Sequence, residues 1–341
     1  MIFSSCKLKK ETFKKKKLML NLGEHIIESY AHILNADKSV LKLNPTLEKF
    51  GYRFVWIDAS EFERNFSELL NVPRSDGRLL TIIIGRDQHG ISHELHNAIV
   101  HTPIFGQRFL HMEFPGILLL QKIDTFKISG DAYDYSKESV EFSNFQPVVN
   151  DLLLQMRLFR PGEIRCSQLF HITSVSRQIS WRKTEISIGS FGDYLLSDED
   201  AASLSFAVTP KYDCNALTEL AIKNFSVVYD IPDGRIRFIT LMTCLESLFN
   251  LGKDQIAHTI ARHLALIISS DKEQFKINYS RIKKLYNTRN SIVHGGEYKG
   301  DLMTDYLDLS DKVRKAINYC NTPTLTKEKL FEQLNTAGFK E

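Results

Sequence analysis

A basic, amphipathic segment ends in the run LYNTRNSIVHG, residues 285–295. Its apolar residues recur at helical spacing with those before it, so the segment predicts one helix that carries the run near its end. The run places a permanent cation (Arg289), an amide (Asn290) and an imidazole (His294) within six residues. A guanidinium can stabilise growing charge on a phosphate, and an imidazole can exchange a proton near neutral pH.

The neighbouring segments share this periodicity. One helix is predicted from about Phe238 to Gly252, a second from an N-cap at Asp254, and a fourth over 302–317 after the Gly295-Gly296 pair. Four amphipathic helices with short connections predict an antiparallel four-helix bundle within residues 233–341.

The preceding chain has a mixed character, so the predicted fold class is α+β. Residues 18–145 form the expected N-terminal domain, and 146–232 form a connecting α+β segment. The expected strands are 52–57, 79–84, 117–120 and an extended stretch over 170–188. The expected helices lie near 61–71, 92–100, 148–159 (ended by Pro161-Gly162) and 216–228. Residues 130–149 are polar and aperiodic, which is typical of a linker.

The composition excludes several classes of protein. Five scattered cysteines, none in a C-x-x-C pair, argue against a disulfide framework and a thiolate zinc site. No apolar run approaches the roughly 20 residues that span a bilayer, and the N-terminus lacks the apolar core of a signal peptide. We therefore expect a cytoplasmic protein that does not bind membranes.

The formal net charge of +3 is unevenly distributed. Residues 1–17 hold seven lysines against one glutamate and are expected to form a solvated basic tail. Residues 276–299 hold six basic residues against one glutamate. A polyanion such as RNA is expected to be attracted to both places, and Arg281, Lys283 and Lys284 are the candidate RNA-binding residues beside the run.

The chain resembles the Apea-like HEPN family, which includes bacterial defence and toxin ribonucleases. The matching runs are Leu245-Glu246-Ser247-Leu248-Phe249, Ala261-Arg262-His263-Leu264-Ala265 and the 285–295 run, together covering roughly 235–320. The run Met156-Arg157-Leu158-Phe159-Arg160-Pro161-Gly162 also resembles segments upstream of that domain.

This resemblance implies a metal-independent endoribonuclease with no cofactor, acting as an anti-phage or growth-arrest effector. Its catalytic residues would be Arg289 and His294, assisted by Asn290. The substrate would be RNA, either tRNA or mRNA, and an antitoxin or a phage-derived trigger would regulate the activity. The family also forms dimers with the motifs facing each other.

Helix geometry gives a separate reason to expect a homodimer. Residues five apart on a continuous helix diverge by roughly 140°. Arg289 and His294 therefore reach one phosphate only if the helix ends before Gly295, or if a second copy supplies one of the two groups.

Other interpretations remain open for the same residues. Arg289 could pair with Glu246 across the bundle, His294 could cap its helix, and Tyr286 could belong to the core. The chain would then be a non-catalytic RNA- or nucleotide-binding module, or a dimerising interaction protein. His89, His93, His96 and His101 form a further cluster, in which His93 and His96 would share a helix face. Gly90 and the order of the residues argue against a zinc site there, so no metal is expected.

Overall fold

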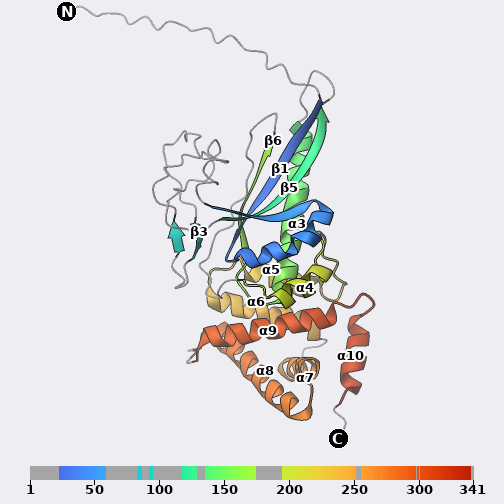
Figure 1. Cartoon of the computed structure of the whole chain (residues 1–341). Helices are drawn as coiled ribbons and strands as arrows, with labels where there is room; N and C mark the ends of the chain where they lie inside the picture. Colours follow the sequence, from blue (N-terminus) through green and yellow to red (C-terminus); the bar gives the residue numbers. More distant parts are fainter. Residues whose placement is uncertain are drawn as a thin grey trace, which may run out of the picture.

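The computed structural model describes residues 23–58, 83–86, 92–94, 117–128, 135–173, 194–250, 255–296, 298 and 300–338. In Figure 1 a sheet backed by a long helix stands at one end, and a group of helices forms the other. The described part is thus mixed α/β with antiparallel strands, which confirms the expected fold class in its coarse form.

The main sheet has four antiparallel strands in the order β2-β5-β1-β6. These strands are β1 (Gly23–Leu34), β2 (Tyr52–Ile57), β5 (Ile117–Ile128) and β6 (Arg165–Thr173). A short two-stranded sheet pairs β3 (Ile83–Arg86) with β4 (Ser92–Glu94). Between β1 and β2 lie η1 (Lys38–Leu43), α1 (Asn44–Leu47) and η2 (Glu48–Phe50).

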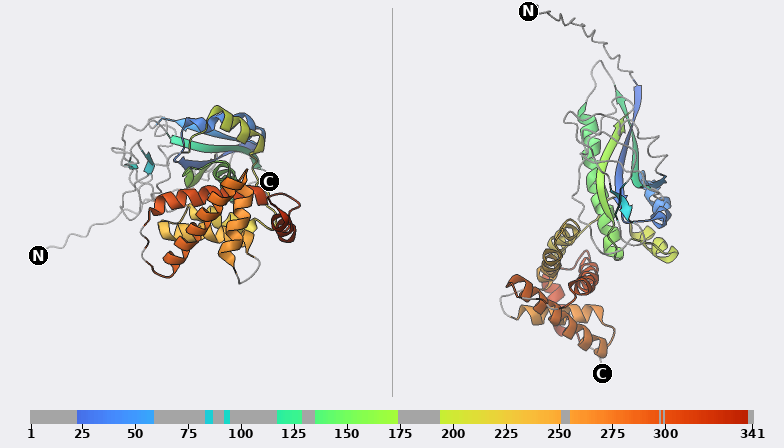
Figure 2. Two further views of the ribbon diagram at one scale, coloured as in Figure 1. Left: turned by 90° about the horizontal axis from the view of Figure 1, so that it is seen from below. Right: turned by 90° about the vertical axis from the view of Figure 1, so that its left-hand side faces the viewer.

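Helix α3 (Tyr135–Phe159) runs along the sheet and joins two hydrophobic cores (Figure 2). Its residues Val149, Leu152 and Met156 belong to the core under the sheet. Leu154 and Leu158, on another side of the helix, belong to the core of the helical end. One helix therefore couples the two ends of the molecule through apolar burial.

The chain leaves α3 through a glycine that no other residue can replace without strain. Gly162 has φ +151°, and a Cβ there would lie 2.8 Å from the side chain of Tyr194. The Tyr194 hydroxyl donates to the carbonyl of Met156, which fixes the same turn from its other side. The turn thus leads the chain from α3 directly into β6.

Among the described residues, six helices build the helical end: α5 (Glu219–Val228), α6 (Gly234–Phe249), α7 (Ile256–Ile268), α8 (Lys272–Val293), α9 (Leu302–Cys320) and α10 (Lys327–Thr336). Helix α4 (Asp198–Ala207) instead packs on the core under the sheet. Asp233, Asp271 and Asp301 cap α6, α8 and α9 by accepting backbone N–H groups, as helix N-termini require.

The four expected C-terminal helices are present as α6 to α9 and share one apolar core. Their arrangement is less regular than an antiparallel bundle. Figure 1 shows α7 along its axis while α9 lies in the plane of the picture, so these two helices cross steeply. Helix α10, which the sequence did not predict, adds Leu330 and Leu334 to the same core.

Several boundaries of helices and strands predicted from the sequence differ from those in the structure. Residues 135–149, expected as linker, belong to α3, so the expected boundary between 145 and 146 falls inside that helix. The strand expected over 79–84 is described only from Ile83. The helix expected near 92–100 was wrong at its start, because 92–94 is strand β4. Gln255, rather than Asp254, is the N-cap of α7. Residues 1–17, the helix near 61–71 and residues 174–188 of the extended stretch lie outside the described residues.

Strand 52–57 is confirmed at both ends, and helix 216–228 is confirmed within three residues. The strand expected over 117–120 is only the first part of β5, which continues to Ile128, and the helix expected over 148–159 is only the last part of α3, which begins at Tyr135. In the described part of the chain, no helix is both long enough and apolar enough to cross a membrane.

Candidate functional site

The run 285–295 ends α8 in a complete C-terminal hydrogen-bonding motif. The N–H of Gly296 donates to the carbonyl of Ser291 (2.7 Å), and the N–H of Gly295 donates to that of Ile292 (3.3 Å). This crossed pair is the Schellman motif, which needs a left-handed residue just past the C-cap. Gly295 supplies that residue with φ +70°, and His294 is the C-cap. The helix therefore ends before Gly295, as one of the two expected geometries requires.

Arg289 points from α8 toward α6. Its Nη2 lies 3.3 Å from Oε1 of Glu246, and its Nη1 donates to Oδ1 of Asn290 at 3.3 Å. The guanidinium carbon also lies 5.8 Å from the ring centre of Tyr286. The pairing with Glu246 that the sequence left open is thus present. The buried Nε of Arg289 has no hydrogen-bond partner in the described structure.

Glu246 and Tyr286 both lie close to this arginine. Tyr286 is buried, as expected for a core residue. Burial raises the pKa of its hydroxyl, and the negative charge of Glu246 raises it further. The side chains of Arg289 and Glu246 are 24% and 21% exposed, so the ion pair lies at the edge of the core and can be reached from solvent.

His294 is exposed at the end of the helix. Its backbone N–H donates to the carbonyl of Asn290, while its imidazole makes no hydrogen bond or ion pair with the described residues. Arg289 and His294 are therefore neighbours in the chain that do not contact each other. The end of α8 therefore presents one arginine held by a carboxylate and one exposed imidazole without a hydrogen-bond partner among the described residues.

The three candidate RNA-binding residues have different surroundings. Arg281 is engaged by two carboxylates of α9, Asp305 and Asp308, each at 2.6 Å, so its charge is already compensated. Lys283 and Lys284 are both exposed. The ammonium of Lys283 lies 5.5 Å from the ring centre of Tyr279, and this contact holds it on one side of α8.

The histidine cluster does not form the predicted helix face, because His93 lies in strand β4. His89, His96 and His101 lie outside the described residues. Within the described ranges, no three His, Cys, Asp or Glu side chains are grouped so that they could hold a metal ion.

A second polar region lies where α3, β6 and α6 meet, and the sequence did not point to it. Arg157, Arg165 and Arg237 are all buried there, at 8%, 4% and 3% exposure. Glu163, 2% exposed, is the buried carboxylate among them: it pairs with Arg165 and, at 3.4 Å, with Arg237.

Arg157 is held differently from its neighbours. Its Nε and Nη2 donate to the carbonyl of Ile164 (3.0 and 2.8 Å), and its guanidinium carbon lies 3.9 Å from the ring centre of Tyr229. It forms no ion pair with any described residue. Burial lowers the pKa of this guanidinium, opposed in part by the negative charges of Asp230 and Glu163. The only sequence signal was the run 156–162, which resembled segments upstream of HEPN domains.

Comparison of the chain with protein-family models, with curated proteins and with solved structures found no match. The resemblance to the Apea-like HEPN family therefore rests on the quoted runs.

Proposed function

We propose that the protein is a metal-independent endoribonuclease of the HEPN type, in which Arg289 and His294 act at the end of α8. One observation carries the proposal: at the end of α8, an arginine held by a carboxylate lies five residues before an exposed imidazole that has no hydrogen-bond partner among the described residues. The resemblance described above supports a role in defence or growth arrest.

The proposed reaction uses the 2′-hydroxyl of the RNA. His294 accepts the proton of that hydroxyl, and the oxygen attacks the adjacent phosphorus. Arg289 stabilises the charge that develops on the phosphorane oxygens. The bond to the 5′-oxygen then breaks, and that oxygen takes a proton from an imidazolium or from water. The products are a 2′,3′-cyclic phosphate and a 5′-hydroxyl.

Glu246 would act as a positioning residue. Its carboxylate holds the Arg289 guanidinium on one side and leaves the donors on the other side for phosphate oxygens. Asn290 adds a second restraint, because its side-chain oxygen accepts from Nη1 of Arg289. A guanidinium fixed in this way loses less rotamer freedom when RNA binds.

A homodimer would complete the site. The side chain of Arg289 is directed to α6, whereas the imidazole of His294 contacts no described residue. A two-fold axis close to the end of α8 would bring the imidazole of one chain near the arginine of the other.

Helix geometry separates the two exposed lysines. Lys283 precedes Asn290 by seven residues and His294 by eleven, so it lies within roughly 20° of both around the axis of α8. Lys284 lies roughly 120° away from Asn290. An RNA strand that reaches Asn290 and His294 along α8 would therefore contact Lys283 and bypass Lys284.

The test is cleavage of total RNA by the purified protein with EDTA present. We expect fragments with cyclic or 3′-phosphate ends, no cleavage by Arg289→Ala or His294→Ala, and normal cleavage by the exposed control Arg235→Ala. Circular dichroism would show that each variant is folded. Near-wild-type cleavage by either folded site variant would exclude the catalytic assignment, and loss of activity in EDTA that metal restores would exclude the metal-independent reaction.

Mixing the two inactive chains tests the composite site. Mixed dimers should recover part of the activity if the arginine and the imidazole come from different subunits. A monomer that cleaves at the full rate would exclude the dimer.

Lys283→Ala should weaken RNA binding and flatten its dependence on salt by about one counterion, whereas Lys284→Ala should leave the slope unchanged. Equal slopes for the two variants would show that the RNA does not follow this side of α8.

A second function is favoured by one observation, namely that the guanidinium of Arg289 is already paired with Glu246. A permanently neutralised arginine would leave a module that binds RNA without cleaving it. RNA binding without cleavage, weakened by Lys283→Ala, would support that function.

A further inference from the structure

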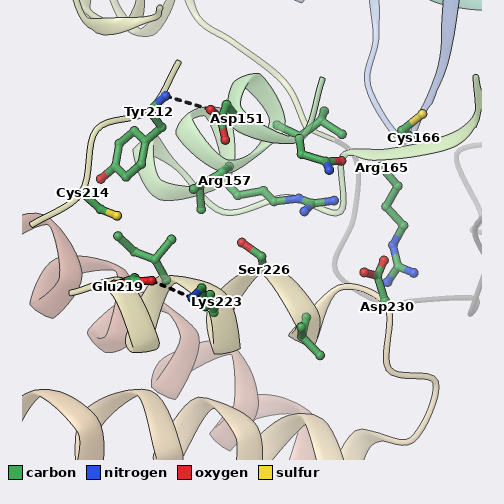
Figure 3. A pocket seen from close by; sticks show the side chains of 15 residues that line it. Asp151, Arg157, Arg165, Cys166, Tyr212, Cys214, Glu219, Lys223, Ser226 and Asp230 are labelled. Atoms are coloured by element: carbon green, nitrogen blue, oxygen red, sulfur yellow. Dashed lines mark hydrogen bonds and ion pairs between the residues drawn. The ribbon is translucent and has the colours of Figure 1, made fainter. Parts of the chain in front are cut away.

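A cavity of about 550 Å³ lies between α3, β6 and α5. Figure 3 shows Arg157 extending along it from α3, with the hydroxyl of Ser226 on α5 facing the same space. None of its lining residues belongs to α8, so it is separate from the proposed catalytic site.

The inner wall of this cavity carries more positive than negative charge. Arg157 and Arg165 line it, and Arg237 lies behind them on Glu163. Glu163 pairs with Arg165 and Arg237, while Arg157 forms no ion pair with a described residue. The charges of Asp230 and Glu163 act on Arg157 but only partly offset the effect of burial on its pKa. A bound anion would supply a direct partner for this buried cation and so lower the cost of burying it.

Arg157 also retains a donor for such an anion. Its contacts with Ile164 and Tyr229 use Nε, Nη2 and one face of the guanidinium, while Nη1 makes no hydrogen bond to any described residue. Because Ile164 and Tyr229 fix the group, Nη1 would meet a ligand with little loss of conformational entropy.

The lining of the cavity also contains acidic side chains. Asp151 and Glu219 lie away from Arg165 in Figure 3, where Glu219 pairs with Lys223 at 2.6 Å and Asp151 accepts the N–H of Tyr212 at 3.0 Å. These carboxylates repel a polyanion, but they can accept hydrogen bonds from hydroxyl groups. A third carboxylate, Asp230, lies nearer the arginines, and its charge acts on Arg157. The lining also includes apolar and aromatic side chains: Leu153, Leu154, Ile222 and Tyr212.

We propose that this cavity binds a phosphate monoester of nucleotide size, with its phosphate against Arg157 and its hydroxyl-bearing part toward Asp151. The volume is in the range of small-molecule sites and far exceeds that of a lone phosphate ion. The carboxylates of Asp151 and Glu219 favour one phosphate over three. The site does not depend on the proposed ribonuclease activity.

The experiment is calorimetric titration of the full-length protein with AMP, GMP, CMP and UMP, and with adenosine, ATP and inorganic phosphate. We expect at least one monophosphate to bind, with adenosine, ATP and inorganic phosphate each at least tenfold weaker. Failure of all four monophosphates to bind at millimolar concentration would overturn the proposal, as would binding of adenosine as tight as that of AMP.

Two variants locate the binding. Ser226→Phe fills the cavity and leaves Arg157 in place, so it should weaken binding at least tenfold. The matched control Ser203→Phe, at an exposed position of α4, should bind normally. Arg157→Lys keeps the charge but loses the fork of donors, and should also weaken binding. If Arg157→Lys does not fold, the binding measured for Ser226→Phe tests the proposal by itself. Binding that survives Ser226→Phe but is lost in Arg289→Ala would place the ligand at the end of α8 and overturn the proposal.

Discussion

Two regions of this protein contain clustered charged side chains, which are buried in one region and accessible to solvent in the other. Where the sheet meets the helices, Arg165 and Arg237 are buried against Glu163. At the end of α8, Arg289 shares a half-exposed carboxylate and His294 is fully exposed. The buried ion pairs fix how the two ends of the molecule meet. The charged groups at the end of α8 remain available to a ligand, because little folding free energy depends on them.

The largest effect is expected from breaking the buried network. Glu163→Gln removes the carboxylate that pairs with both Arg165 and Arg237 and takes one counter-charge from these buried cations. We expect a loss of about 3–5 kcal/mol in the free energy of unfolding, measured by urea denaturation. The control Asp213→Asn breaks a pair with Lys211 whose two side chains are 83% and 82% exposed, and should change nothing measurable. A similarly small effect of Glu163→Gln would show that the network is not structural.

The next largest effect concerns the histidines and pH. Burial lowers the pKa of His32 to about 4, so the folded state prefers the neutral ring. The unfolded chain binds a proton first as the pH falls. Stability is therefore full above about pH 6.5 and is lost progressively down to about pH 4. The loss is roughly 3 kcal/mol for this one group.

Comparison of variants isolates that contribution from the carboxylates that titrate in the same range. The free energy of unfolding of His32→Leu should fall less steeply between pH 6.5 and 4 than that of the wild type. Parallel curves for His32→Leu and the wild type would contradict the assignment.

Gly295→Ala should have a smaller effect, confined to the end of α8. Alanine at φ +70° costs about 1 kcal/mol, and the two bonds of the Schellman motif would weaken. The free energy of unfolding should fall by that amount, and RNA cleavage should fall with it because His294 precedes this residue. Gly338→Ala, where a Cβ meets nothing within 4 Å, is the control. Full activity in a destabilised Gly295→Ala protein would separate the capping motif from the site.

The smallest change in stability is expected for Glu246→Gln. A half-exposed ion pair contributes at most about 1 kcal/mol to the free energy of unfolding. Cleavage should nevertheless slow by about tenfold or more, since catalysis is sensitive to small displacements of Arg289. Glu219→Gln, which breaks the exposed pair with Lys223, should leave cleavage unaltered. An unchanged single-turnover rate for Glu246→Gln would show that the carboxylate does not position the arginine.

Helices α6 to α9 were predictable because each buries one apolar stripe at a regular period and begins or ends at residues that favour helix ends. Strand β1 was not predicted. It lies between β5 and β6 in the sheet. Side chains on both of its faces are buried, as Tyr30, Ala31, Ile33 and Leu34 show. The sequence of β1 therefore lacks the alternation of apolar and polar residues that marks a strand buried on one face only. The start of α3 was missed because its sequence is polar up to Phe145.

For the sites, too, some features follow from the sequence and others only from the tertiary structure. The sequence by itself determined the end of α8. The capping glycine, the order of Arg289, Asn290 and His294, and the side of the helix that Lys283 shares with Asn290 and His294 follow from residue type and a fixed rotation per residue. The tertiary structure decided which basic side chains have a partner and which remain free to meet a ligand. Glu246 meets Arg289, Asp305 meets Arg281, and Arg314 donates to the carbonyl of Arg157, a residue 157 positions earlier. Such contacts depend on how whole helices pack, which no local pattern of residues specifies.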